Sequence, residues 1–216
     1  MSFIILACTQ EFALLLGDTR LIHKSDEGIE SIIDDYALVP KVFQINSKII
    51  AGFTGNYRDT LRFIRKLCKM NSIDRSLLSI NAVQRLFIEF CSETNAELRC
   101  IMAGKSDEGE ISIFTANENN TYATEYVNKG DMLLRYSVPY DVNLRLAEEK
   151  FRLLIKGDTY NSLVQCVIHI ASLSKSVNSR IFGIKLLWNG ESKEYFHNMT
   201  INDILSITEC FSKFLD

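Results

Sequence analysis

The stretch KVFQINSKIIAGFTGNYRD, residues 41–59, holds the most informative pattern in the chain. It predicts two short strands with a turn at Asn46-Ser47, and the second strand leads into a Gly-x-x-Gly loop, Gly52 to Gly55, ahead of a helix. A helix begins with backbone N–H groups that have no partner within the helix, and its dipole favours negative charge there. The loop therefore indicates a place where a developing oxyanion could be stabilised.

Apolar runs before this segment predict a tight hairpin of buried strands at 2–9 and 12–17. The polar residues 18–20 end the second strand. Residues 23–36 are acidic and contain Gly28, which predicts an exposed loop. An amphipathic helical turn carrying Ile29, Ile32 and Ile33 is the alternative for this loop.

The remaining pattern predicts strands and helices in blocks, without strand–helix–strand alternation. The expected strands are 37–40, 42–45, 48–53, 98–103, 110–116, 121–127, 132–138, 180–189 and 193–196. The expected helices are 56–70, 79–97, 141–155, 160–174 and 201–214. This order disfavours a parallel sheet and predicts an α+β fold in one domain, residues 1–216. We expect two stacked antiparallel sheets between helical layers, a four-layer αββα sandwich.

Composition excludes several classes of function. Of the 216 residues 47% are apolar and 24% are charged, and the net charge of −3 does not favour nucleic acid or an anionic membrane as a partner. No apolar run approaches the roughly 18 residues of a membrane-spanning helix, and no basic region precedes the short apolar run at the start, so we expect a cytoplasmic protein. The six cysteines and three histidines show no metal-ligand spacing, and we expect neither metal nor cofactor.

Four residues form a candidate catalytic constellation: Ser2, Asp18, Lys41 and Gly55. Asp18, which stands in Asp-x-Arg, comes sixteen positions after Ser2, and Gly55 comes fourteen positions after Lys41. These spacings resemble the proteasome family of N-terminal nucleophile (Ntn) hydrolases, which includes proteasome β-type subunits and their bacterial ring-protease relatives. The likeness is clearest over residues 2–70, with an insertion of about seven residues between Asp18 and Lys41.

The resemblance implies a threonine-type endopeptidase, here with a serine, that cleaves peptide bonds. After removal of Met1, the Ser2 hydroxyl would be the nucleophile and its own α-amine the base, since that amine has a reference pKa of about 7.7–8.0. Lys41 would lower the pKa of neighbouring groups, Asp18 would hold Lys41, and the Gly55 N–H would bind the oxyanion. If Met1 stays, this mechanism fails.

The resemblance also implies a substrate pocket and partners. Leu21, Val39, Phe53 and Tyr57 would line the pocket for the residue before the cut, and their apolar character predicts a preference for small or medium apolar side chains. The family assembles into rings, so we expect a homo-oligomer acting on peptides or proteins, with or without an unfoldase. An apolar face on the helix 56–70 suits either self-assembly or packing on the sheet.

Two family features are absent from the second half of the chain. The family's Gly-Ser-Gly would fall near Tyr140, where this chain has other residues. The family's Asp-x-x-Ser-Gly-Gly would fall near residues 174–179, which contain no aspartate. Asp141 offers a substitute from another direction. Two alternatives to a peptidase therefore remain: a non-catalytic subunit with the same fold, and an Ntn amidase that acts on a small molecule.

Overall fold

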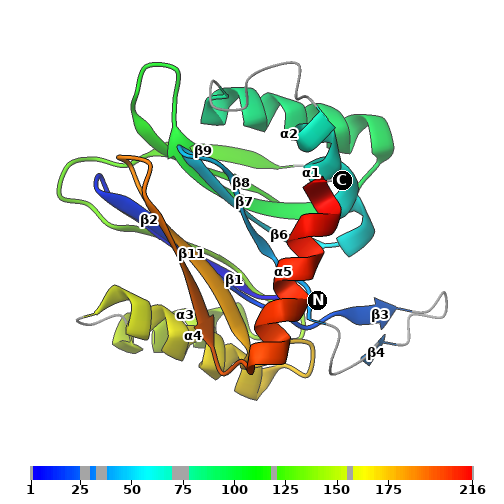
Figure 1. Ribbon diagram of the computed structural model, residues 1–216. Coiled ribbons are helices and arrows are strands. Elements are labelled where there is room, and N and C mark those ends of the chain that lie inside the picture. Colours follow the sequence, from blue (N-terminus) through cyan, green and yellow to red (C-terminus); the bar gives the residue numbers. More distant parts are fainter. Residues whose placement is uncertain are drawn as a thin grey trace.

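The computed structural model describes residues 2–24, 30–32, 38–69, 78–117, 121–154 and 158–215. These residues form an α+β fold with two five-stranded antiparallel sheets, a small two-stranded sheet and five helices. The α+β class and the antiparallel pairing predicted from sequence are confirmed. Figure 1 shows the two large sheets stacked between helices.

The first sheet combines three separate parts of the chain in the order β10-β1-β2-β11-β12. Its strands are β1 (Ile4–Cys8), β2 (Phe12–Asp18), β10 (Leu133–Ser137), β11 (Ile181–Leu187) and β12 (Ser192–His197). In β1 and β2 nearly every side chain is buried, as continuous apolar runs predict for strands covered on both faces. This register brings three segments to the end of the sheet where Ser2 lies. They are the segment after β2, the segment after β10 and the segment before β11.

The second sheet follows the order of the chain, β5-β6-β7-β8-β9. Its strands are β5 (Val42–Asn46), β6 (Ile49–Gly55), β7 (Leu98–Lys105), β8 (Ile111–Ala116) and β9 (Tyr122–Tyr126). The predicted turn between β5 and β6 is confirmed: the Asn46 side chain accepts a hydrogen bond from the Lys48 amide at 2.8 Å. The predicted Gly-x-x-Gly loop is wrong, because Gly52 to Gly55 all belong to β6 and the next helix begins at Tyr57.

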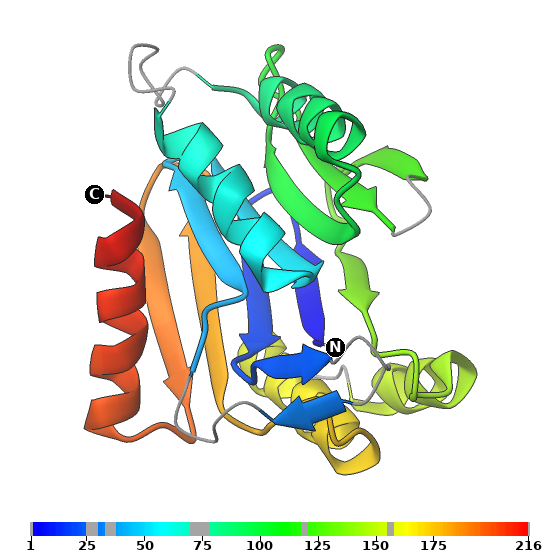
Figure 2. The same cartoon turned by 90° about the vertical axis from the view of Figure 1, so that its right-hand side faces the viewer.

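Three hydrophobic clusters define the layers. One lies between the second sheet and the helices α1 (Tyr57–Lys69) and α2 (Ile80–Thr94), and a second lies between the two sheets. The third lies between the first sheet and the helices α3 (Leu144–Leu154) and α4 (Thr159–Leu173). The last helix, α5 (Ile201–Leu215), runs along the side of the sheets (Figures 1 and 2), and its Ile207 packs into the middle cluster.

The apolar face of α1 packs on the second sheet. Phe63, Ile64 and Leu67 are at most 6% exposed and belong to the cluster shared with α2. Of the two uses that the sequence left open for this face, packing on the sheet is the observed one. Among the described residues no helix is long and apolar enough to cross a membrane.

The region between β2 and β5 differs from its prediction. Residues 23–36 were expected to form a loop or a helical turn, but β3 (Ile22–Lys24) pairs with β4 (Glu30–Ile32), because antiparallel backbone bonds satisfy both short segments. The expected strand at 37–40 is reduced to one bridge between Leu38 and Arg20. Residues 25–29 and 33–37, with Ile29 and Ile33 of the alternative helical turn, lie outside the described residues.

Candidate active site

Asp18 is the buried anion of the candidate site. It ends β2, is fully buried, and accepts hydrogen bonds from the backbone N–H of Phe3 at 2.7 Å and of Arg20 at 3.0 Å. The first bond ties the beginning of the chain to the end of β2, and the second fixes the bend that comes after β2. Asp18 therefore positions the backbone next to Ser2 and at the end of the neighbouring strand.

Lys41 reaches Ser2 from the second sheet. It precedes β5 and lies over Gly17, where an added Cβ would come within 3.1 Å of the Lys41 Cβ, so the absence of a side chain at Gly17 allows the two sheets to approach. The Lys41 Nζ donates to the Ser2 Oγ and, at 2.8 Å, to the Arg20 carbonyl. Ser2 and Lys41 are each 6% exposed. The structure thus brings together Ser2, Asp18 and Lys41.

Burial is the main electrostatic influence on this group. It raises the pKa of Asp18, against the opposing effects of Lys41 and of the two backbone N–H donors. Burial likewise lowers the pKa of Lys41, against the opposing effect of Asp18. A lysine with a lowered pKa beside a serine hydroxyl is typical of sites that move protons, although buried structural ion pairs show the same pattern.

Gly55 lies at the end of β6, opposite Leu98 of β7. Its φ of +108° is disfavoured for L side chains, and an added Cβ would lie 2.4 Å from the Glu97 carbonyl oxygen, so the position requires glycine. The sequence predicted free backbone N–H groups at the start of α1, but the Arg58 N–H already donates to the Asn56 side chain at 2.9 Å. The role of the Gly55 N–H as oxyanion donor stays a prediction.

The four predicted pocket residues do not form one lining. Phe53 is 1% exposed, and its ring contacts Phe43, Phe63 and Phe87 in the cluster beneath α1 and α2, so it does not line an open pocket. The half-buried Tyr57 packs against the same cluster.

The other two predicted pocket residues, Leu21 and Val39, lie nearer the bend of the chain after Asp18. Val39 is 5% exposed and donates its N–H to the Thr19 carbonyl at 3.0 Å, and Leu21 is half-buried. Their place in a substrate pocket stays a prediction.

A second polar cluster lies at the same end of the first sheet. The Ser174 Oγ donates to both carboxylate oxygens of Asp141, at 2.9 and 2.8 Å, and lies 2.6 Å from the Ser176 Oγ. Both serines are 3% exposed, whereas Asp141 is exposed. Asp141, the substitute that the sequence offered, thus binds Ser174 in the segment 174–179. Residue spacing did not indicate this pairing, because it joins two segments 33 residues apart.

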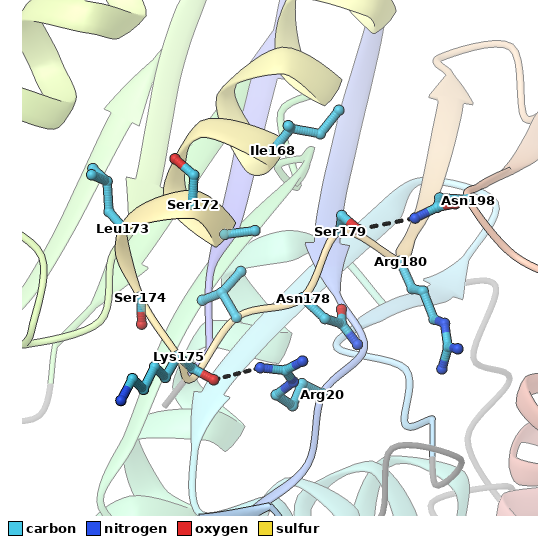
Figure 3. A pocket seen from close by; sticks show the side chains of 12 residues that line it. Arg20, Ile168, Ser172, Leu173, Ser174, Lys175, Asn178, Ser179, Arg180 and Asn198 are labelled. Atoms are coloured by element: carbon cyan, nitrogen blue, oxygen red, sulfur yellow. Dashed lines mark hydrogen bonds between the residues drawn. The ribbon is translucent and has the colours of Figure 1, made fainter.

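A cavity of about 980 Å³ lies beside this loop (Figure 3). It is bounded by the last turns of α4, the segment 174–180, and the side chains of Arg20 and Asn198. The backbone of Arg20 belongs to the candidate site, since its N–H binds Asp18 and its carbonyl binds Lys41. Arg20 therefore connects the cavity to the candidate site.

Comparisons with known proteins add no family. No family model matches the chain, and no curated protein sequence matches it. Within the described residues no group of three or more histidine, cysteine, aspartate or glutamate side chains is placed to hold a metal ion. A functional proposal therefore depends on the geometry of the described residues.

Proposed function

We propose that this protein is a proteasome-like N-terminal nucleophile hydrolase of the four-layer αββα fold, which cleaves peptide bonds with Ser2 after Met1 is removed. The observation that supports the proposal most is the hydrogen bond from the buried Lys41 ammonium to the Ser2 hydroxyl. Burying a lysine and an aspartate at one strand end opposes folding, and such an arrangement is typical of functional sites.

The proposed reaction uses the groups at that strand end. The Ser2 Oγ attacks the carbonyl carbon of the scissile amide, and the free α-amine of Ser2 takes the hydroxyl proton. Negative charge on the former carbonyl oxygen is stabilised by the Gly55 N–H. The α-amine then gives its proton to the leaving amine, and the C–N bond breaks. Water attacks the resulting Ser2 ester, loses a proton to the amine, and releases the acid and the free Ser2.

Lys41 and Asp18 support this cycle without entering it covalently. The positive charge of Lys41 next to the Ser2 Oγ favours the alkoxide that develops during attack, and it lowers the pKa of the nearby amine. Asp18 holds the backbone next to Ser2, and its charge opposes the lowering of the Lys41 pKa by burial. A positioned base contributes about 10²–10⁴ in rate, and one oxyanion donor about 10²–10³.

A non-catalytic subunit with the same fold is the second candidate. The observation that favours it is the low exposure of Ser2, 6%, which gives a peptide carbonyl little access to the hydroxyl. In the proposed hydrolase, substrate or the loss of Met1 must open this position.

The deciding experiment is the intact mass of the native protein before and after treatment with a peptide epoxyketone, which reacts with a terminal hydroxyl and a free amine together. We expect loss of Met1 and one adduct per chain. The adduct should be absent in Ser2→Ala and present in Ser47→Ala, a matched control at an exposed turn. A retained Met1, or a processed chain that never reacts, would favour the non-catalytic subunit.

The proposal extends to self-assembly. Because α1 uses its apolar face within the fold, the outer face of α3 is the better candidate for contact between copies: Leu146 and Leu153 are 59% and 64% exposed. Sedimentation of the purified chain, compared with Leu146→Glu and Leu153→Glu, measures this part of the proposal separately from catalysis.

A further inference from the structure

Two hydrogen bonds join the second sheet to the end of β10, the edge strand of the first sheet. The Thr54 hydroxyl of β6 lies 3.2 Å from the Ser137 hydroxyl at the end of β10. The Arg99 guanidinium of β7 donates to the Val138 carbonyl at 2.9 Å. Thr54 and Arg99 are opposite each other in the second sheet, so the two hydrogen bonds are neighbours. Together they attach β6 and β7 to the end of β10.

The contact between Thr54 and Ser137 lies beside the strand that follows Ser2. Ser137 is the partner of Ile4 in the pairing of β10 with β1, and Ile4 is two residues after Ser2. In the second sheet Thr54 directly precedes Gly55, whose N–H is the proposed oxyanion donor. The contact therefore ties the residue before Gly55 to the strand beside Ser2.

Lys41 makes the corresponding connection on the other side of β1. Its Nζ donates to the Ser2 Oγ and to the Arg20 carbonyl in the bend after β2. Its own carbonyl accepts from the Phe53 N–H of β6 at 2.9 Å. Because β1 lies between β10 and β2 in the first sheet, the end of β6 is attached on both sides of the strand that follows Ser2.

The side chain of Thr54 faces the first sheet and is buried. Phe53 packs beneath α1 and α2, whereas an added Cβ at Gly52 would meet side chains of the first sheet. Thr54 comes two residues after Gly52 and therefore lies on the same face of β6. It is 5% exposed, and a buried hydroxyl that loses its hydrogen bond opposes folding.

We infer that Thr54 and Ser137 are positioning residues of the proposed hydrolase. Their contact sets where the Gly55 N–H lies relative to the Ser2 hydroxyl, and neither of the two hydroxyls enters the reaction. The inference rests on the proposed function, since it concerns the same nucleophile and oxyanion donor. A displacement of about 1 Å can cost about 10² in rate, so loss of the contact should slow the chemical step more than it weakens substrate binding.

The test is the kinetics of adduct formation by the peptide epoxyketone on the full chain, measured over a range of inhibitor concentrations. Thr54→Val removes the hydroxyl at nearly constant shape, and Ser137→Ala removes its partner. We expect each variant to lower the maximal rate of adduct formation about tenfold and to leave the concentration for half-maximal rate unchanged. Urea denaturation establishes that each variant is folded under the conditions of the assay.

Three further variants separate positioning from a general loss of structure. Thr54→Ser keeps the hydroxyl and should retain most of the wild-type rate. Thr54→Val/Ser137→Ala should react no more slowly than the slower single variant, because both single changes break the same contact. Thr115→Val, at a half-buried threonine of β8, two strands from β6, is the matched control and should react as the wild type does.

Failure of this inference and failure of the proposed function give different results. If the wild type reacts and Thr54→Val keeps the same maximal rate, the positioning role is wrong and the proposed hydrolase stands. If the wild type never reacts, the positioning role falls together with the proposed function.

Hydrogen–deuterium exchange measures the contact without any reaction. The backbone amides of residues 53–57 should exchange faster in Thr54→Val than in the wild type, and at the wild-type rate in Thr115→Val. Equal exchange in the two variants would overturn the inference whether or not the wild type reacts.

Discussion

Two polar clusters lie at the same end of the first sheet, and each contains a carboxylate and a buried serine. In the first, Asp18 and Lys41 are both buried, and the Lys41 Nζ contacts the Ser2 hydroxyl. In the second, the exposed Asp141 carboxylate accepts from Ser174, which also contacts Ser176. The hydrogen bonds that join these three side chains involve no basic group.

The two clusters differ in the free energy that their burial takes from folding and in the chemistry that they allow. A buried cation beside a buried anion loses hydration that the pair only partly replaces, so it is weak evidence for stability and better evidence for function. A serine that caps a loop and donates to a solvated carboxylate is an ordinary stabilising contact. The first cluster is therefore our candidate for chemistry, and the second for holding the loop that borders the cavity.

Lys41→Met should give the largest effect. It leaves Asp18 buried without its cation, so we expect the free energy of unfolding to fall by about 3 kcal/mol. Labelling of Ser2 by the epoxyketone should slow by about 10²–10⁴. Urea denaturation and the rate of adduct formation measure the two effects on the same preparation.

The double variant Asp18→Asn/Lys41→Met separates these effects. Removing both charges should restore most of the lost stability, because no unpaired buried charge remains, whereas labelling should stay slow. If labelling returned together with stability, Lys41 would be a structural residue and the contrast between the two clusters would disappear.

Gly55→Ala should give the next largest effect. The new Cβ would meet the Glu97 carbonyl oxygen at 2.4 Å in a backbone conformation that alanine disfavours, which displaces the Gly55 N–H. We expect a loss of about 1–3 kcal/mol in stability and about 10²–10³ in labelling rate.

Gly109→Ala is the matched control for Gly55→Ala. Gly109 also has a positive φ, +85°, but nothing lies within 4 Å of its added Cβ. This control should show the conformational cost, about 1 kcal/mol, with unchanged labelling. Equal labelling rates for the two glycine variants would remove Gly55 from the proposed oxyanion site.

Local patterns predicted most of the fold. The i, i+3, i+4 recurrence placed α1 and α2, and the turn residues at Asn189-Gly190 placed the β11–β12 hairpin, where Gly190 has a φ of +99°. These elements depend on neighbours in sequence, so their residues carry the signal. The proximity of Ser2, Asp18 and Lys41 was implied by the resemblance to the Ntn-hydrolase family, and the structure places the three together.

The side of a strand on which a residue lies was the signal missed at Phe53. Neighbouring residues in a strand face opposite ways. An added Cβ at Gly52 would meet Ile4 and Leu15 of the first sheet, so Phe53 must face α1 and α2. The hydrogen bond from Ser174 to Asp141 and the cavity with basic lining residues could not be predicted from the local sequence. Both depend on loops brought together only by the pairing of β1 with β10 and of β2 with β11.

Ser174→Ala tests the second cluster, with a smaller expected effect. It removes the donor to Asp141 and the acceptor of the Ser176 amide at 3.1 Å, so we expect the free energy of unfolding to fall by about 1–2 kcal/mol. Labelling of Ser2 should be unchanged. Ser172→Ala, at an exposed serine one residue before the end of α4, should leave stability within about 0.5 kcal/mol. A loss of labelling in Ser174→Ala would make the second cluster part of the catalytic site.

The smallest expected effect is a pH dependence confined to the first cluster. Burial raises the pKa of Asp18, so the folded chain takes up this proton at a higher pH than the unfolded chain does. The resulting stabilisation is complete below the unfolded value of about 3.9 and is lost as pH rises through the raised pKa of the folded state. The wild type should therefore gain stability relative to Asp18→Asn as pH falls from neutrality toward that value, which urea denaturation over a series of pH values measures.

Lys41→Met sharpens this last comparison. Lys41 lowers the pKa of Asp18, so its removal should raise that pKa further and move the pH-dependent gain toward neutrality. Ser174→Ala leaves the charges around Asp18 intact and should keep the pH range of the wild type. If the pH range were the same in Lys41→Met and Ser174→Ala, then Asp18 and Lys41 would not interact through their charges. The first cluster would then offer no more reason than the second to be considered a catalytic site.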